Sequence, residues 1–130
     1  MLETLHIENN GVPIYIQIRD QILAAIGLGT LKPGERLPTM REVAVALRVD
    51  LNTVKHAYDS AQKTRAITLV KARGTFVAEH PPKIDLDSRD QKLERLAYQS
   101  IATANAAGID PASLGNRIIE ITLRQIAQGK

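Results

Sequence analysis

The stretch TMREVAVALRVDLNTVKHAYDSAQKT, residues 39–64, decides the fold. Thr39 and Glu42 have the spacing of a capping box, in which the two side chains satisfy free amides at a helix start. This predicts one helix that ends at about Leu47 and, because Asp50 can cap a helix start, a second helix over the rest of the stretch. Two short helices joined by a tight turn are typical of a helix-turn-helix.

The second of these helices, from Leu51 to about Thr64, has two unlike sides. Val54, Tyr58 and Ala61 cluster on one side and are expected to pack inward. The side that faces outward carries Asn52, Lys55, His56 and Asp59. A polar outer face at this position is typical of a helix that reads DNA bases, although a merely solvated face has the same pattern.

A helix and a hairpin flank this pair. Pro13 is well placed in the first turn of a helix that runs to about Leu28, with one face formed by Ile14, Ile18, Ile22 and Ala25. After the pair, residues 67–70 and 75–78 are β-prone runs separated by Lys71-Ala72-Arg73-Gly74. They predict a hairpin with a small basic tip, which is the wing of a winged helix-turn-helix.

Pro81 and Pro82 mark a boundary, because consecutive prolines remove two backbone donors. We therefore expect a DNA-binding domain over 1–80 and a two-helix dimerisation region over 84–130. Its first helix would be ended by Gly108 and has an apolar arc formed by Leu86, Leu93, Leu96, Ala97, Ser100, Ala104 and Ala107. The fold class expected is α+β, mainly helical.

The last helix, expected to start at Asp110 and Pro111, is apolar on two sides. Leu114, Ile118 and Ile121 lie on one side, and Ile119, Leu123 and Ile126 lie nearly opposite. One neighbouring helix cannot cover both sides, so a second copy of the chain is predicted to do so. The expected dimerisation residues are Leu93, Leu96, Leu114, Ile118, Ile119, Leu123 and Ile126.

Composition limits the function further. The 130 residues carry a net charge of +3, but residues 32–73 hold nine basic and four acidic side chains, a local balance of +5. Phosphate binding depends on such local charge. There is no cysteine, no apolar run long enough to span a membrane and no leader pattern, so we expect a cytoplasmic protein without a membrane partner.

An enzyme is not expected. His6, His56 and His80 have no metal-ligand spacing, and no glycine-rich phosphate loop follows a strand. Asp85, Asp87 and Asp90 lack the glycine and distal glutamate of a calcium loop and suit a helix start. No catalytic residue, metal site or cofactor is predicted.

Six blocks in order resemble the DNA-binding domain of GntR-family regulators, over roughly residues 10 to 78. They are Pro13-Ile14-Tyr15 with Gln17-Ile18, Gly29 through Leu31, Pro33-Gly34, Leu37-Pro38 with Arg41-Glu42, Asn52-Thr53-Val54 with Ala57-Tyr58, and Arg73-Gly74-Thr75-Phe76-Val77. The short helical tail is similar to the YtrA subfamily. The resemblance implies a homodimeric winged helix-turn-helix, usually a repressor and often linked to transporter operons.

The predicted DNA-binding residues come from the helix pair and the wing. They are Thr39, Arg41, Leu51, Asn52, Thr53, Lys55, His56, Lys71, Arg73 and Gly74. Asn52 suits adenine, and Lys55 suits a guanine edge or a phosphate. Arg41 matches a DNA-contacting arginine of the family and suits a base or a phosphate. Thr39 is either a helix cap or a phosphate contact, and Lys71 either a wing contact or an exposed charge.

The chain departs from the family pattern at the start of the reading helix. Leu51 stands where the family often has a base-reading arginine, and Asp50 where serine or threonine is usual. Leu51 either meets a thymine methyl group or packs inward, so the resemblance does not fix the specificity.

Double-stranded DNA, in a palindromic operator, is therefore the expected partner. A winged helix that binds a protein or RNA is the alternative, but one phenylalanine, three tyrosines and no tryptophan offer few stacking platforms for RNA. An unknown small-molecule effector is a further possible partner, and it would bind at the dimer interface or near Pro81.

Overall fold

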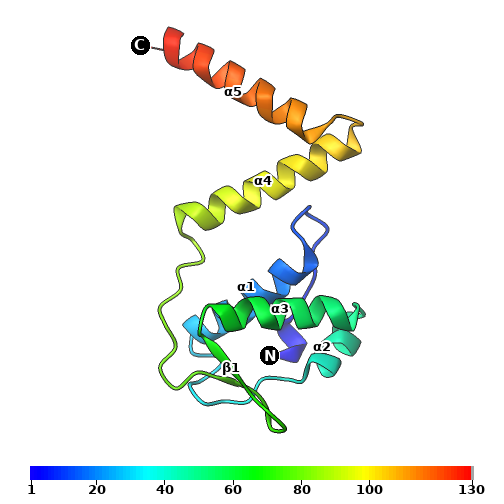
Figure 1. Ribbon diagram of the computed structural model, residues 1–130, viewed down its shortest axis with the longest axis vertical. Coiled ribbons are helices and arrows are strands. Elements are labelled where there is room, and N and C mark those ends of the chain that lie inside the picture. Colours follow the sequence, from blue (N-terminus) through cyan, green and yellow to red (C-terminus); the bar gives the residue numbers. More distant parts are fainter. Residues whose placement is uncertain (130) are drawn as a thin grey trace. The chain divides into compact units, whose positions relative to one another are not determined.

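The computed structural model describes residues 1–129 and is mainly helical with one small antiparallel sheet (Figure 1). Its elements in chain order are η1 (Leu2–Thr4), α1 (Ile14–Gly27), α2 (Met40–Leu47), α3 (Leu51–Lys63), β1 (Ile67–Val70), β2 (Gly74–Val77), α4 (Arg89–Ala106) and α5 (Pro111–Gln128). The order confirms the predicted α+β class, with a winged helix-turn-helix followed by two helices. None of these helices is both long and apolar enough for a membrane span.

The chain forms two compact units. The first comprises residues 1–9 and 13–88, and the second comprises residues 10–12 and those from 89 onward. The first unit therefore contains α1, α2, α3 and the hairpin, and the second contains α4 and α5. The predicted assignment of DNA binding to 1–80 and of dimerisation to 84–130 stays a prediction.

The core of the first unit lies around α3, which packs against α1, α2 and β1. The side chains that are almost completely buried are Ile18, Ile22, Val43, Val54, Ala57, Tyr58, Ala61, Ile67 and Val77. The Tyr58 hydroxyl donates a hydrogen bond to the Pro38 carbonyl at 2.6 Å. Burial raises the pKa of Tyr58, so the phenol stays protonated and keeps this bond between α3 and the segment before α2.

The buried face of α1 differs in part from the prediction. Ile18 and Ile22 are buried as expected, together with Ile16 and Leu23, whereas Ile14 is 39% exposed. Pro13 is the N-cap and not part of the first turn, so Ile14 begins the helix and lines a surface hollow beside α3. Ala25 is half-buried.

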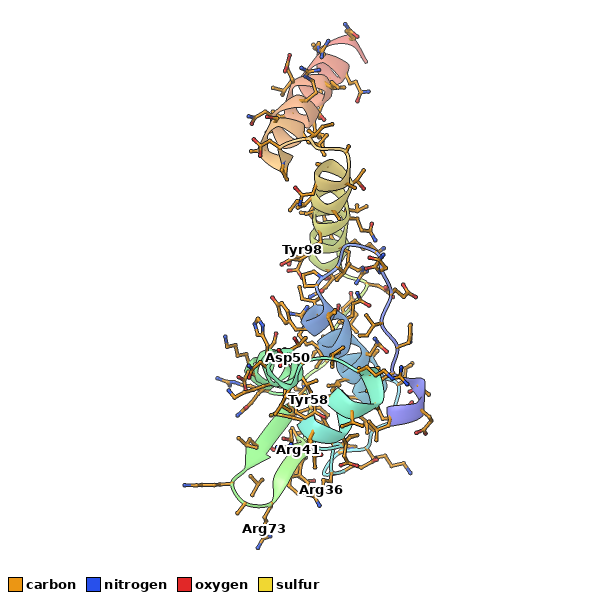
Figure 2. All side chains as sticks on the ribbon, turned by 90° about the vertical axis from the view of Figure 1, so that its right-hand side faces the viewer. Arg36, Arg41, Asp50, Tyr58, Arg73 and Tyr98 are labelled. Carbon is orange, nitrogen blue, oxygen red and sulfur yellow. The ribbon has the colours of Figure 1, made fainter. Side chains whose placement is uncertain are left out.

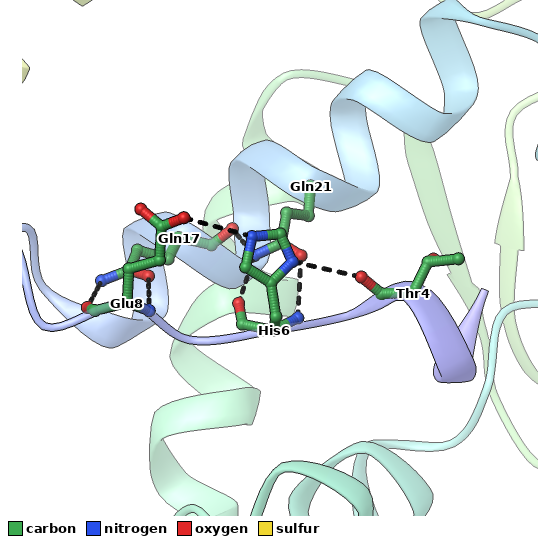
Figure 3. A network of polar contacts seen from close by, with 5 residues as sticks. All are labelled: Thr4, His6, Glu8, Gln17 and Gln21. Atoms are coloured by element: carbon green, nitrogen blue, oxygen red, sulfur yellow. Dashed lines mark hydrogen bonds and ion pairs between the residues drawn. The ribbon is translucent and has the colours of Figure 1, made fainter.

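The N-terminal segment is held on α1 by two glutamine side chains, a feature absent from the sequence analysis (Figure 3). The Gln21 amide accepts from the His6 backbone N–H at 3.1 Å and donates to the His6 carbonyl at 2.7 Å. Gln17 makes the same pair of bonds to Glu8, at 2.8 and 2.9 Å. Two alternate residues of the N-terminal segment, His6 and Glu8, thus bond to glutamines that lie one helical turn apart on α1. Leu5, which precedes them, is buried in the core.

The wing is a hairpin in which Ile67 pairs with Val77 and Val70 pairs with Gly74. β2 therefore runs from Gly74 to Val77, one residue earlier than predicted. The shift arises because the turn needs only residues 71–73, with Ala72 in the left-handed region at φ 67° and the Arg73 N–H donating to the Val70 carbonyl at 2.9 Å.

The second unit contains the two tail helices. Asp110 caps α5 by accepting from the Ala112 N–H at 3.3 Å, and Pro111 is in the first turn, as predicted. α4 is followed by Gly108 at φ 72°. Residues 10–12 pack on α4 so closely that a Cβ on Gly11 would lie 2.7 Å from the Ala102 Cβ.

Leu86 was predicted on the apolar arc of α4, and this is wrong. It precedes the helix and packs against the core of the first unit. The Asp85 carboxylate accepts from the Asp87 N–H at 3.0 Å and its carbonyl accepts from the Ser88 N–H at 3.2 Å. These bonds form a turn over 85–88, so the helix starts only at Arg89.

Candidate nucleic-acid interface

The start of α2 is fixed by the predicted capping box. The Thr39 hydroxyl oxygen accepts from the Glu42 N–H at 3.1 Å, and the Glu42 carboxylate accepts from the Thr39 N–H at 3.0 Å. The hydrogen bond that the Glu42 carboxylate accepts from the Thr39 N–H, followed by one from the Thr39 side chain, holds the pKa of Glu42 below its ordinary value. The Thr39 hydroxyl is thus engaged with Glu42 both as acceptor and as donor, and its predicted phosphate contact stays a prediction.

A tight turn then sets the direction of α3. Arg48 adopts the left-handed conformation at φ 55° and ψ 48°, and its N–H bonds back to α2. Asp50 caps α3 by accepting from the Asn52 N–H at 3.0 Å. Aspartate thus replaces the serine or threonine of the family pattern as a cap, but it places a negative charge at the helix end that would face phosphates.

α3 presents the predicted polar face. Asn52, Lys55 and His56 are exposed, whereas Thr53 and Asp59 are half-buried. Leu51 is 40% exposed and does not belong to the core cluster. Its side chain is therefore partly accessible to solvent at the start of α3.

Two residues of this face already have partners. The Lys55 ammonium lies 3.1 Å from the Asp59 carboxylate in an exposed pair one turn apart. Such pairs contribute only about 0.3 to 0.5 kcal/mol, so a phosphate competes easily for the lysine. The His56 ring stacks on the Tyr15 ring of α1, with ring centroids 3.7 Å apart.

The basic residues around the helix pair and the wing are exposed. These are Arg41 at the start of α2 and Lys71 and Arg73 at the wing tip. Within residues 1–129, none of the three has an ion-pair partner, so their charges are available to an anionic ligand. Figure 2 shows Arg41 and Arg73 at the end of the first unit that carries the wing, together with Arg36.

Arg36 was not among the predicted site residues. Its backbone pairs with Phe76 of β2, and its guanidinium lies against Gly74, where a Cβ would be 3.0 Å from Nε. The charge count over 32–73 included Arg36, but only the pairing of residues far apart in the chain brings it to the wing. Gly74 itself is half-buried at φ 125°.

The predicted dimerisation residues are largely accessible in the single chain. Leu93, Leu96, Ile119 and Leu123 are each about 60% exposed, Ile118 and Ile126 about half exposed, and Leu114 half-buried. Ile121, on the same side of α5 as Ile118, is 42% exposed. Both sides of α5 thus carry apolar side chains that are partly or largely exposed in the single chain.

Two hollows lie beside the segment that follows the wing. One, of about 550 Å³, is lined by α1 and by Ile84, Asp85, Leu86 and Asp87. The other, of about 470 Å³, is lined by Ile26, Gly27, and residues 81–85. They are the spaces that a small molecule near Pro81 would enter, and the predicted effector stays a prediction.

Comparison with known proteins identifies this arrangement. The family model described as "Bacterial regulatory proteins, gntR family" matches residues 14–77, the range from α1 to the end of β2. The HTH-type transcriptional repressor YtrA of Bacillus subtilis is 30% identical over 113 residues, which cover 87% of each chain. The chain belongs to the GntR family. It is a DNA-binding transcriptional regulator and not an enzyme.

Other transcriptional regulators resemble the chain over most of its length. The HTH-type transcriptional regulator Rv1152 of Mycobacterium tuberculosis is 31% identical and aligns over 76% of this chain and 77% of its own. A GntR family transcriptional regulator from Listeria monocytogenes superposes with a TM-score of 0.56 at 26% identity, covering 87% of this chain and 98% of that one. The tail helices are therefore part of the shared fold.

Proposed function

We propose that this GntR-family chain is a homodimeric repressor that binds a palindromic operator in double-stranded DNA. α3 would lie in the major groove, with Arg41 and the start of α2 on the flanking phosphates and the wing tip against the minor groove. The observation that supports a dimer is the exposure of apolar side chains on both sides of α5. The repressor role is supported by the similarity to the YtrA repressor of Bacillus subtilis.

The energetic argument rests on α5. Ile119 and Leu123 are 60% and 61% exposed, and Ile118 on another side is 49% exposed. Full burial of such a side chain contributes about 1.5 to 3 kcal/mol, so several of them favour association strongly. A two-fold dimer uses the same patch on both copies and presents two identical reading helices. Its operator would consist of two half-sites with inverted sequences.

The bases would be read by the exposed residues of α3. Asn52 has the donor and acceptor pair that matches adenine, and Lys55 can leave its exposed ion pair for guanine or phosphate. A winged helix that binds only a protein or an RNA is the alternative function. It would use the same fold but would not need a dimer, and a module that binds a protein would not need the unpaired charges of Arg41, Lys71 and Arg73 either.

Selection of bound sites from random duplexes by the full chain tests the proposal. We expect an enriched inverted repeat, and scrambling one half-site should weaken binding strongly. No enrichment, or stronger binding to RNA than to any duplex, would favour the alternative function.

The dimer is tested by the double substitution Ile119→Asp and Leu123→Asp. Asn116→Asp is the matched control, because it adds a charge to an exposed polar position of the same helix. Sedimentation should give a dimer for the wild type and for the control, and a monomer for the double variant. A double variant that still sediments as a dimer would place the interface elsewhere.

A further inference from the structure

The segment before α2, residues 34–37, pairs with β2 as a third, strand-like segment beside the hairpin. The Gly34 N–H donates to the Val77 carbonyl, the Val77 N–H to the Glu35 carbonyl, and the Leu37 N–H to the Thr75 carbonyl, at 2.8 to 2.9 Å. Arg36 forms an antiparallel bridge with Phe76. Because neighbouring residues of an extended segment point to opposite faces, the burial of Leu37 leaves Arg36 on the exposed face.

Gly74 provides the space in which the Arg36 guanidinium lies. A Cβ on residue 74 would come within 3.0 Å of Nε, 3.4 Å of Nη2 and 3.5 Å of Cζ. Any side chain there would displace the guanidinium. Gly74 also has φ 125°, which L-residues rarely adopt, so the position strongly favours glycine.

The charge of Arg36 is not neutralised by an ion pair in the part of the chain that the structure describes. Glu42, at the start of α2, is near enough for Arg36 to contribute a little to the lowering of its pKa, after the larger effect of the bonds from Thr39. Arg36 therefore lies between β2 and the start of α2. Both elements are ones that the proposed function places on DNA.

We propose that Arg36 is a further DNA-contacting residue that binds a backbone phosphate beside the wing, and that Gly74 is the residue that positions it. The proposal rests on the DNA binding proposed above. A phosphate is favoured over a base edge because the guanidinium is held beside Gly74, the first residue of β2, behind residues 71–73, which form the tip of the hairpin. A planar guanidinium suits two phosphate oxygens.

The test compares Arg36→Ala, Arg36→Lys and the control Lys63→Ala on the duplex that the full wild-type chain enriches. Lys63 is an exposed lysine at the far end of α3, so its replacement removes the same charge away from the wing. Arg36→Ala should weaken binding to every duplex roughly tenfold, as expected for the loss of a charged hydrogen bond. The log-log salt slope should fall by about 0.9 for each protomer.

Arg36→Lys should keep the salt slope, and Lys63→Ala should bind like the wild type. The enriched sequence should be the same for all variants. If Arg36→Ala behaves like Lys63→Ala, the contact does not exist. An altered enriched sequence with an unchanged slope would make Arg36 a base reader and overturn the phosphate assignment. A wild-type chain that enriches no duplex would overturn the proposed function instead.

The positioning role of Gly74 is tested by introducing Gly74→Ala into the wild type and into the Arg36→Ala variant. In the chain that carries Gly74→Ala, the guanidinium is already displaced, so Arg36→Ala should have little further effect on the salt slope. Gly29→Ala is the control for backbone strain, because Gly29 has φ 80° with open space around it. Melting curves identify variants that do not fold. Equal effects of Arg36→Ala with and without Gly74→Ala would remove the positioning role and leave the phosphate contact standing.

Discussion

The Tyr15 ring in the first turn of α1 stacks on the His56 ring of α3, with centroids 3.7 Å apart and planes inclined by 11°. Both residues line a hollow with Ile14, Asn52 and Thr53. The contact joins the first helix of the domain to the helix proposed to read bases. It also restrains His56, which the sequence pattern places on the outward side of α3.

The stack predicts an energetic coupling between the two residues. Aromatic pairs contribute about 0.5 to 1.5 kcal/mol beyond the area that they bury. In a double-mutant cycle, Tyr15→Leu and His56→Ala should together destabilise the fold by that amount less than the sum of their separate effects. Chemical denaturation measures the cycle, and Tyr15→Phe should keep the coupling. Strictly additive losses would mean that the stack does not stabilise the fold.

The capping box predicts a dependence of stability on pH. The pKa of Glu42 is lowered in the folded state, chiefly by the hydrogen bond from the Thr39 backbone, relative to its ordinary value of 4.5. A lowered folded pKa gives stability that is present above the unfolded pKa and is lost as the pH falls through the folded one. The melting temperature of the wild type should therefore fall faster on acidification below pH 4.5 than that of Glu42→Gln.

A glutamine at residue 42 can still accept from the Thr39 N–H but does not titrate. The difference in melting temperature between wild type and Glu42→Gln should thus shrink as the pH falls. Glu120→Gln is the control, because this exposed glutamate caps no helix. A difference that stays constant over the whole range would show that the Glu42 charge adds nothing to the cap.

The glutamine contacts of the N-terminal segment predict a graded loss of stability. Gln21→Ala removes two hydrogen bonds to His6, each contributing about 1 kcal/mol at most in an exposed position. Gln21→Glu should cost at least as much, because its carboxylate still accepts from the His6 N–H but sets a second oxygen without a proton against the His6 carbonyl oxygen. Denaturation curves give both values, with Gln62→Ala on the exposed side of α3 as control. A glutamate variant as stable as the wild type would contradict the paired geometry.

Local patterns predicted much of the first unit because the interactions concerned are local. The cap formed by Thr39 and Glu42, the cap at Asp50 and the buried side of α3 each depend on residues within one or two turns. Pairings between distant segments could not be predicted in this way. The clamp of Gln21 on His6 and the position of Arg36 against Gly74 appear only when residues that are 15 and 38 positions apart meet.

The same reasoning explains the errors at element ends. Leu86 fits the helical wheel of α4, but the wheel does not show that the turn at Asp85 has already taken up the neighbouring amides. For the DNA-binding residues, the sequence predicts side-chain types and faces, and the structure gives their exposure. Which of them bind bases depends on contacts with a partner and stays a prediction.

Leu51 provides the last prediction. It is the first residue of α3 and is 40% exposed, which leaves it accessible to a thymine methyl group in the major groove. Leu51→Arg should then raise affinity for duplexes in general and shift the preference towards guanine at one position in each half-site. A well-formed bidentate pair contributes about 1 to 3 kcal/mol of discrimination.

The competing arrangement, with Leu51 packed against α2, predicts a different outcome, because an arginine there would be a buried charge without a partner and would lower the melting temperature. Binding-site selection and thermal denaturation are therefore measured on the same variant. Leu51→Met is the control, since it keeps an apolar side chain of similar volume and should leave both melting and preference nearly unchanged. A Leu51→Arg variant with wild-type melting and an unaltered site preference would place residue 51 away from both the core and the bases.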